Sequence, residues 1–458
     1  MATTYLTRTQ SNTGSETKGT FSAWIKRSKL GSIQVLFSSK ASSEFFAIEF
    51  DASDKFQANL QINGTDYLNL KTTRVLRDTS AWYNLVVAID STDSTQADRV
   101  KMYVNGVRET SFSTNLNNVS SSLNMRINGS SQNPFIGSFE PTSAQDFDGS
   151  MSHIHWVDGT AYPASAFGST DSTTGEWKIN TSPSVTYGTN GFFILKDGNT
   201  ITDSSPNSNN FSLGGGTLTK TEDCPSNNFA TWNASDRWLG NTAGNGDFLR
   251  NGNTYFRTTS DSQKALVRST IGVTSGKYYC EMKVTQIERT WVGICNKQIF
   301  TSSSEWWTQS NNNGLYWYGN GTAMYDAQNN SGNAYGGFVN NDIVMIALDM
   351  DNKALYFGKN GTWLNSGDPT SGSSKTGSVT EYSTLTNASY ALENYEEVYF
   401  MAGEPSTAGI GQVYANFGNG YFGTTAVSSA GTNASGNGIF EYDVPAGYTA
   451  LSTKGINL

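Results

Sequence analysis

Short segments in which apolar and polar residues alternate, separated by Asn-Gly or Asp-Gly pairs, recur along this chain of 458 residues. In segment 83–89, the alternation places Tyr83, Leu85, Val87 and Ile89 on one face of a strand. Asn-Gly pairs begin, for example, at Asn63, Asn105, Asn128, Asn190 and Asn360. Such pairs accept the positive φ angles of tight hairpin turns at little cost. The sequence has no capped stretch of ten or more residues with helical periodicity. It therefore predicts an all-β protein built from antiparallel β-sandwich (jelly-roll) domains.

Composition and charge narrow the class of protein further. Charged residues make up only 15% of the chain and aromatic residues 12%, the reverse of a disordered composition. The net charge of −9 and the lack of a basic cluster argue against nucleic-acid binding. No apolar run is long enough to cross a bilayer, so we expect no membrane insertion.

The first residues of the chain and its cysteines indicate the cellular compartment in which the protein is made. Residues 1–8 contain no apolar core of a signal peptide, so we expect synthesis in the host cytoplasm. Three cysteines, Cys224, Cys280 and Cys295, are too few and odd in number for a disulfide scaffold. We therefore expect buried free thiols formed in a reducing cytoplasm.

The chain divides into two halves, each with its own set of strand patterns. Residues 1–200 carry one set of strand patterns and residues 229–458 a second set. Between them, residues 201–228 contain a run of Asp, Ser, Pro and Asn and a glycine triplet, which predicts a loop-rich connector. Two β-sandwich domains in tandem are therefore expected.

Ordered motifs in each half resemble known families. The first half resembles the laminin-G/concanavalin-A-like lectin superfamily, in the form common in marine phage structural proteins. The residues that carry this resemblance are 20–32, 82–90, 101–106, 135–137, 147–151 and 158–161. The second half resembles a SPRY (B30.2-like) sandwich. Its markers are residues 276–282, 291–294, 342–351, 355–363 and 413–418, and segment 440–448 resembles the ending of such phage proteins.

The resemblance implies a non-enzymatic bacteriophage virion protein. The leading expectation is an exposed, tail-fibre-like appendage subunit that binds host-surface glycan or a protein receptor. Fibres usually form trimers, so we expect a homo-oligomer, for which the resemblance suggests a trimer. The alternative is a capsid decoration or tail-assembly protein whose sandwiches bind other virion proteins. The lectin-like pattern begins almost at Met1, so we expect no N-terminal anchor, which favours this alternative.

Catalytic signatures are missing from the sequence. There is no phosphate loop, no G-x-S-x-G elbow and no H-E-x-x-H motif. Segment 49–54 is similar to the Glu-x-Asp-x-x-Glu strand of jelly-roll glucanases, whose hydrolysis needs two closely spaced carboxyls. Here the third carboxylate is the shorter Asp54, and Asp51 to Lys55 has the pattern of a hairpin turn. We therefore expect no enzyme.

His153 and His155, the two histidines of the chain, should share one strand face. They would either hold a metal ion where three chains meet or form part of a polar sheet face.

Asp146 and Asp148 precede a flexible glycine. This loop is one where the lectin-like family often binds Ca²⁺, and Asp-Gly turns also form without metal. The pair is therefore either a calcium site or an ordinary turn.

An aromatic cluster in an Asn-rich region suggests a ligand site in the second half. Sugars present apolar C–H faces that stack on aromatic rings, and carboxylates bond their hydroxyls. The candidate ligand-binding residues are Trp306, Trp307, Tyr325 and Asp326, because loops at one end of SPRY sandwiches commonly bind ligands. The alternative is that Trp317 and one tryptophan of the pair fill the core.

Overall fold

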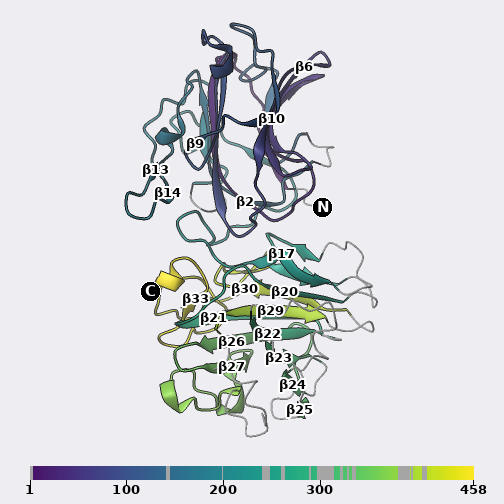
Figure 1. Ribbon diagram of the computed structural model, residues 1–458, viewed down its shortest axis with the longest axis vertical. Helices are drawn as coiled ribbons and strands as arrows, with labels where there is room; N and C mark the ends of the chain where they lie inside the picture. Colours follow the sequence, from purple (N-terminus) through teal and green to yellow (C-terminus); the bar gives the residue numbers. More distant parts are fainter. Residues whose placement is uncertain are drawn as a thin grey trace. The chain divides into compact units, whose positions relative to one another are not determined.

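The computed structural model describes residues 4–140, 145–196, 198, 200–239, 248–258, 264–287, 290–296, 314–319, 323–326, 330–332, 337–379, 392, 396–404 and 410–457. These residues form two compact units, one of residues 1–220 and 224–226 and one of residues 221–223 and 227–458. Each unit contains two large β-sheets (Figure 1). In the described part of the chain, helical structure consists of short 3-10 turns, and none of it could span a membrane.

The first unit packs an eight-stranded sheet against a six-stranded sheet. The eight-stranded sheet has the order β10-β6-β5-β4-β3-β11-β1-β16. Its strands are β1 Tyr5–Thr7, β3 Gln34–Ala41, β4 Glu44–Phe50, β5 Lys55–Ile62, β6 Thr65–Val75, β10 Phe112–Asn117, β11 Asn133–Ile136 and β16 Ser212–Gly215. The six-stranded sheet has the order β15-β12-β2-β7-β8-β9. Its strands are β2 Lys18–Arg27, β7 Trp82–Asp90, β8 Val100–Val104, β9 Val107–Arg108, β12 Gly149–Asp158 and β15 Phe192–Ile194. A hairpin of β13 Gly168–Thr170 and β14 Trp177–Ile179 and the turns η1 Gln96–Asp98 and η2 Ala164–Ala166 complete the unit.

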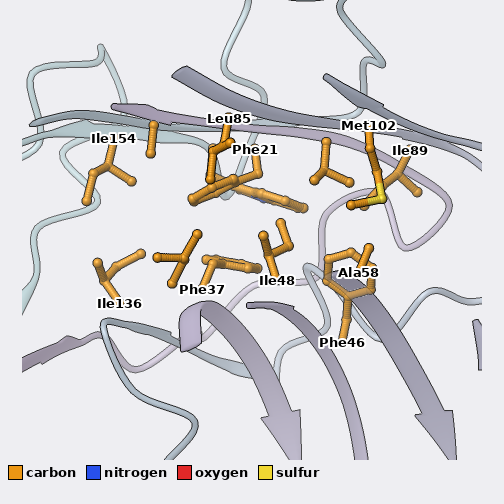
Figure 2. Close-up of a cluster of buried hydrophobic side chains, with 14 of the residues drawn as sticks. Phe21, Phe37, Phe46, Ile48, Ala58, Leu85, Ile89, Met102, Ile136 and Ile154 are labelled. Carbon is orange, nitrogen blue, oxygen red and sulfur yellow. The ribbon is translucent and has the colours of Figure 1, made fainter. Parts of the chain in front are cut away.

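The core of the first unit lies between these two sheets, as Figure 2 shows. Phe21 and Leu85 point into it from the six-stranded sheet, and Phe37 and Ile48 meet them from the eight-stranded sheet. Because side chains alternate along a strand, the residues between these positions face outward. The alternation expected for segment 83–89 is confirmed.

The second unit has the same two-layer plan. One sheet has the order β17-β20-β29-β22-β23-β24-β25 and contains β17 Trp232–Leu239, β20 Ala265–Ser269, β22 Trp291–Asn296, β23 Gly314–Tyr318, β24 Ala323–Asp326, β25 Asn330–Gly332 and β29 Val398–Glu404. The other has the order β18-β19-β30-β21-β26-β27-β28 and contains β18 Leu249–Arg250, β19 Tyr255–Arg257, β21 Lys277–Gln286, β26 Ile343–Asp349, β27 Ala354–Lys359, β28 Thr362–Trp363 and β30 Gln412–Asn416, with β33 Thr449–Ala450 parallel to β21. Smaller elements are the hairpin β31 Tyr421–Phe422 and β32 Thr425–Ala426 and the turns η4 Leu364–Ser366, η5 Gly372–Ser374 and η9 Gly455–Asn457. The predicted fold class, tandem antiparallel sandwiches, is confirmed.

The C-terminal segment covers the outer face of β21 and its neighbours. Phe440, Val444 and Tyr448 pack against the outward-facing Tyr279 and Tyr356 in a buried cluster. This segment is also held by the buried carboxylate of Glu281, which accepts hydrogen bonds from the backbone N–H groups of residues 441 and 442, both at 2.8 Å. The second unit thus protects an apolar sheet face with its own chain.

Residues from the expected connector contribute to the first unit. β16 pairs with β1, and Phe211 is buried in the first core. The carboxylate of Asp203 accepts hydrogen bonds from the backbone N–H groups of Phe193 and Ser205, both at 2.8 Å. The structure therefore places the division between the units near residue 220.

The cysteines are free thiols in different surroundings. Cys280 and Cys295 are buried, and burial raises the pKa of both thiols, that of Cys295 to about 12. The prediction of buried thiols is confirmed for these two. It is wrong for Cys224, which is only partly buried.

Candidate functional site

Only two of the four candidate ligand-binding residues of the second unit lie in the part of the chain that the structure describes. Trp306 and Trp307 lie outside the described residues. Tyr325 and Asp326 belong to β24, where their backbones pair with Tyr316 and Leu315 of β23. The assignment of these four residues to a ligand site stays a prediction.

The aromatic residues on β22 and β23 are packed rather than open. The rings of Trp291 and Tyr316 stack with centroids 4.3 Å apart, and Tyr318 meets Trp291 edge-on. All three rings are buried on the outer side of the sheet, in one cluster with Met401. Trp317 faces the other way and is fully buried in the core, as the core alternative expected.

Asp146 and Asp148 lie where the chain approaches β12. Asp146 forms a parallel bridge with Val35 of β3, and burial raises the pKa of its carboxyl although Ser138 hydrogen-bonds to it. The backbone carbonyl of Asp148 accepts a hydrogen bond from the Ser28 N–H. Among the described residues, no group of three or more His, Cys, Asp or Glu side chains could hold a metal ion. Calcium binding by Asp146 and Asp148 stays a prediction.

The two histidines do not form a polar sheet face, so that expectation is wrong. His155 is 2% exposed, and its Nδ1 lies 2.9 Å from the hydroxyl of Tyr187. Its ring stacks on Phe193 at 3.9 Å, and His153 contacts the same ring. Residues 162–187 bring an apolar layer, including Phe167, over this face of the six-stranded sheet. Burial lowers the pKa of His155 far below its usual value, so the ring is neutral.

The hairpin turn predicted at Asp51 to Lys55 is confirmed, because residues 51–54 connect β4 and β5. Asp54 has a φ of 64° and hydrogen-bonds to Arg27 at 3.0 Å and to Arg77 at 2.9 Å. Because the carboxylate is buried in these ion pairs, it stabilises the turn. Asp51 caps the same turn by accepting bonds from the N–H groups of Ser53 and Lys55.

The outer side of the eight-stranded sheet carries a continuous polar surface. Because Phe46 and Ile48 face the core, Glu49 faces outward. In one cross-strand row, Glu49 pairs with Gln57 and Gln57 with Lys71. We name the following residues of β4, β5, β6 and β10 the polar face: Glu49, Gln57, Asn59, Asn69, Lys71 and Thr114.

Two hydrogen-bond acceptors on the polar face lack a donor. The side chain of Glu49 is 8% exposed, and its carboxylate makes no hydrogen bond to any described residue. Burial raises its pKa to about 7, Lys71 opposes this rise, and Asp51 adds to it. The Oδ1 atom of Asn59 is fully buried without a partner, whereas the Glu49 oxygens are not among the fully buried unpartnered atoms. A fully buried acceptor such as this Oδ1 costs about 1–3 kcal/mol when it stays unpaired.

The remaining polar groups of the face are partly engaged with each other. The side-chain amide of Gln57 donates to Oδ1 of Asn69 at 3.2 Å, and Nζ of Lys71 lies 3.5 Å from Asp51. On the same side of β4, the ring of Phe45 meets Phe139 edge-on at 4.8 Å. An apolar aromatic pair therefore borders a surface of amides and charges.

Sequence reasoning missed the polar face, although one signal was present. Residues 55–62 alternate strictly between polar and apolar, and the polar positions Lys55, Gln57, Asn59 and Gln61 include three amides. Three amides on one strand face are unusual for a face that merely meets solvent. The charged and amide partners on β4 and β6 come from separate hairpins, so only the folded sheet brings them together.

The fold is that of two β-sandwiches in tandem. Residues 1–165 match the family model of the concanavalin A-like lectin/glucanases superfamily, and residues 277–379 match the SPRY domain model. Both domains are found in the expected order. No match was found among curated proteins.

Solved structures resemble parts of the chain. The SPRY domain of human HERC1 is 18% identical, with 35% of this chain and 87% of that chain covered and a TM-score of 0.26. A heptameric SAP-like pentraxin from Limulus polyphemus is 15% identical, with 35% and 71% covered and a TM-score of 0.27. A putative carbohydrate binding protein from Bacteroides ovatus is 14% identical, with 48% and 58% covered and a TM-score of 0.32. At such low identities and TM-scores, these likenesses carry no argument about function.

Proposed function

We propose that this protein is a non-enzymatic glycan-binding subunit of a phage virion, of the tail-fibre type, and that the polar face is its contact surface for glycan. Lectin-like and SPRY sandwiches are typical binding modules, which suggests a glycan or a protein as the partner. The observation that favours glycan is the cross-strand set of amide, hydroxyl and charged side chains on the outer side of a lectin-like sheet.

The chemistry of the polar face suits a sugar. Asn59, Asn69, Gln57 and Thr114 offer neutral donors and acceptors, and sugars present many hydroxyl groups of both kinds. The border of Phe45 and Phe139 offers an apolar surface for sugar C–H groups.

The carboxylates give no support to a glucanase. Asp54 is neutralised by two arginines, and Asp51 is bound to the turn and to Lys71. Glu49 is therefore the one carboxylate of segment 49–54 whose side chain is not engaged among the described residues. Release of reducing sugar from a host glycan by the purified protein would overturn the non-enzymatic part of the proposal.

Binding is tested with fluorescently labelled protein on candidate host cells, with and without periodate oxidation of surface sugars. Saturable binding that periodate abolishes is expected. Asn69→Ala should weaken it about tenfold, because the variant loses its hydrogen bonds to the ligand. The matched control is Asn115→Ala, which makes the same substitution on the neighbouring β10 at an exposed position opposite Leu70, off the polar face. Equal binding by both variants would remove the polar face from the proposal.

The virion assignment is supported by the ordered motifs that resemble phage structural proteins, and it needs its own test. Mass spectrometry of purified particles should detect the chain at a fixed copy number. Its absence from the particles would refute a virion role. Presence on particles without cell binding by the purified, multivalent protein would favour a capsid decoration or tail-assembly role instead.

A further inference from the structure

In the second unit, the outer side of the sheet formed by β18, β19, β30 and β21 carries positively charged side chains. Phe256, Met282 and Val413 of these strands point into the core. Because side chains alternate along a strand, the residues next to them face outward. We name the following outward-facing residues the cationic face: Arg250, Tyr255, Arg257, Lys283, Gln412 and Tyr414.

One cross-strand row of this face places two cations on either side of two tyrosines. Arg250 pairs with Tyr255, and Tyr255 pairs with Tyr414. Tyr414 in turn pairs with Lys283. The two tyrosine rings stack with their centroids 4.0 Å apart. Burial raises the pKa of Tyr255 to about 12, and Tyr414 adds to this rise. Arg257 and Arg250 oppose the rise, which places both guanidinium groups near this tyrosine.

The charged ends of Arg257 and Lys283 are accessible to a ligand. Neither side chain forms an ion pair or a hydrogen bond with any described residue. Nε of Arg257 is fully buried, whereas its two terminal nitrogens and Nζ of Lys283 are not among the fully buried unpartnered atoms. Lys283 Nζ lies 5.9 Å from the centre of the Phe422 ring. The terminal nitrogens of Arg257 and Nζ of Lys283 are therefore the donors that this face offers.

The only carboxylate of β21 does not neutralise this charge. Glu281 lies two residues before Lys283 on the same strand face, and it accepts hydrogen bonds from the backbone N–H groups of residues 441 and 442. The outward-facing neighbours Gln412 and Thr285 are uncharged and hydrogen-bond to each other at 3.4 Å. The whole chain has a net charge of −9, but charges more than about 8 Å away are largely screened at physiological ionic strength. The face is therefore locally positive.

The spacing of Arg257 and Lys283 suits a ligand with more than one acid group. They lie on β19 and β21, which flank β30, and they are two residues apart in register. A strand separation of about 4.8 Å and a rise of about 3.3 Å per residue place their Cα atoms about 12 Å apart. An acidic sugar chain presents carboxylates that are separated by neutral hydroxyl groups. A guanidinium can bind such a carboxylate through two parallel hydrogen bonds, and the amide of Gln412 can bond to hydroxyl groups.

An acidic peptide fits this face less well than an acidic sugar chain. Peptides bind to sheets by adding a strand at an open edge or by placing side chains in apolar pockets. The cationic face lies on the side of a sheet, across β19, β30 and β21, and not along one edge. Tyr255 and Phe422 are only 8% and 5% exposed, so their rings offer no apolar pocket.

We propose that the cationic face is a second binding site, which takes an acidic polysaccharide whose sugar carboxylates bind the terminal nitrogens of Arg257 and Nζ of Lys283. This inference goes beyond the proposed function, which concerns the polar face of the first unit, and it assigns a ligand class to the second unit. Arg257 and Lys283 are the residues that select an acidic sugar chain over a neutral one.

The test measures binding of the full chain to immobilised oligogalacturonates and oligomannuronates. The matched neutral probes are the same oligomers with their carboxyl groups reduced to alcohols, and oligoglutamate is the peptide probe. The proteins are the wild type, Arg257→Gln, Lys283→Gln and the control Lys454→Gln. Lys454 is an exposed lysine in the segment after β33, which pairs with the opposite end of β21. Unfolding temperatures of all four proteins establish that the variants are folded before binding is compared.

The wild type should bind at least one acidic oligomer about tenfold more tightly than its reduced counterpart. Arg257→Gln and Lys283→Gln should each weaken this binding about fivefold to tenfold, because each variant loses a charge-assisted hydrogen-bond donor. Lys454→Gln should change it by less than about twofold. Added salt should weaken binding of the acidic oligomer, since the charges lie at the surface.

Other outcomes would overturn this inference without deciding the proposed function. No preference for either acidic oligomer over its reduced counterpart would reject the ligand class. A preference that neither Arg257→Gln nor Lys283→Gln lowers would reject the cationic face as the site. Binding of oligoglutamate as tight as that of the sugar oligomers, and lost in both variants, would make the ligand an acidic peptide. In each case, periodate-sensitive cell binding that Asn69→Ala weakens would leave the proposed function standing.

Discussion

Replacing Asp54 with Asn removes one charge from a buried ion pair while keeping the backbone preference of the turn. The Asp54 side chain is 5% exposed and that of Arg27 is fully buried, with Arg27 Nη2 3.0 Å from the carboxylate. Asp54 has a φ of 64°, a conformation that Asn adopts as readily as Asp. Asp54→Asn therefore isolates the electrostatic contribution.

The size of the expected stability loss follows from the buried positive charge of Arg27, which would lose its partner. Breaking a buried ion pair by removing one partner costs about 3–5 kcal/mol. Arg27 would keep its hydrogen bond to the Leu76 carbonyl at 2.6 Å and its position over the Phe50 ring at 4.0 Å. The loss should therefore be at the low end, about 3 kcal/mol. For a domain of this size, that lowers the unfolding temperature of the first unit by about 6–12 °C.

The assay is thermal and urea unfolding of the full chain at pH 7. Hydrogen exchange of peptides from β2 and β5 identifies the transition of the first unit. The control Asp66→Asn removes an exposed carboxylate from the next hairpin and should change stability by less than about 0.5 kcal/mol. A loss for Asp54→Asn no larger than that of the control would refute the reasoning.

The effect of Asp54→Asn should also depend on pH. Although burial opposes it, the Gly31 N–H and the two arginines hold the pKa of Asp54 below its usual value of 3.8. A carboxyl with a lowered folded-state pKa stabilises the fold above its unfolded pKa and loses this contribution as pH falls through the folded pKa. The gap between wild type and variant should therefore stay constant from pH 7 to about 4 and narrow below. A gap that is the same at pH 3 would contradict the ion-pair explanation.

Three further predictions concern other buried groups. Burial raises the pKa of Glu281 from 4.5 to about 7. The second unit should therefore lose about 3 kcal/mol of stability as pH rises from 4.5 to 7. Urea unfolding of Glu281→Gln should show no such loss. If the segment near residues 441 and 442 is held by this carboxylate, Glu281→Ala should speed hydrogen exchange of those two amides, and unchanged exchange would reject the anchor. Tyr187→Phe leaves the buried Nδ1 of His155 unpaired and should cost about 1–3 kcal/mol in the first unit, whereas a change within error in its unfolding free energy would show that the contact is unimportant.

The strand pattern and its turns were readable from the sequence because they depend on neighbouring residues. Asn63-Gly64, Asn105-Gly106 and Asn360-Gly361 each close a hairpin, and both residues of each pair have positive φ. The hairpin at Asp51 to Lys55 was predicted for the same reason. The order of motifs along each half was enough to predict one lectin-like sandwich followed by one SPRY-like sandwich.

Two further Asn-Gly pairs show where local reasoning fails. Asn128 and Asn190 do not join paired strands but serve a buried carboxylate, because the Asn128 amide and the Asn190 N–H both donate to Asp158. The same dipeptide thus forms a hairpin in one place and a long-range polar network in another. The sequence does not distinguish the two, since the partner lies 30 or more residues away.

By itself, the sequence determined the all-β class, the tandem arrangement and the alternation by which every second side chain of a strand points inward. Those features follow from the two-residue period of a strand and from turn residues, both local properties. Only the tertiary structure decided which outward faces stay available. The face that carries His155 is covered by residues 162–187, and the face that carries Tyr279 by the C-terminal segment. The face that carries Glu49 brings Gln57 and Lys71 into one cross-strand row, which only the strand register decides.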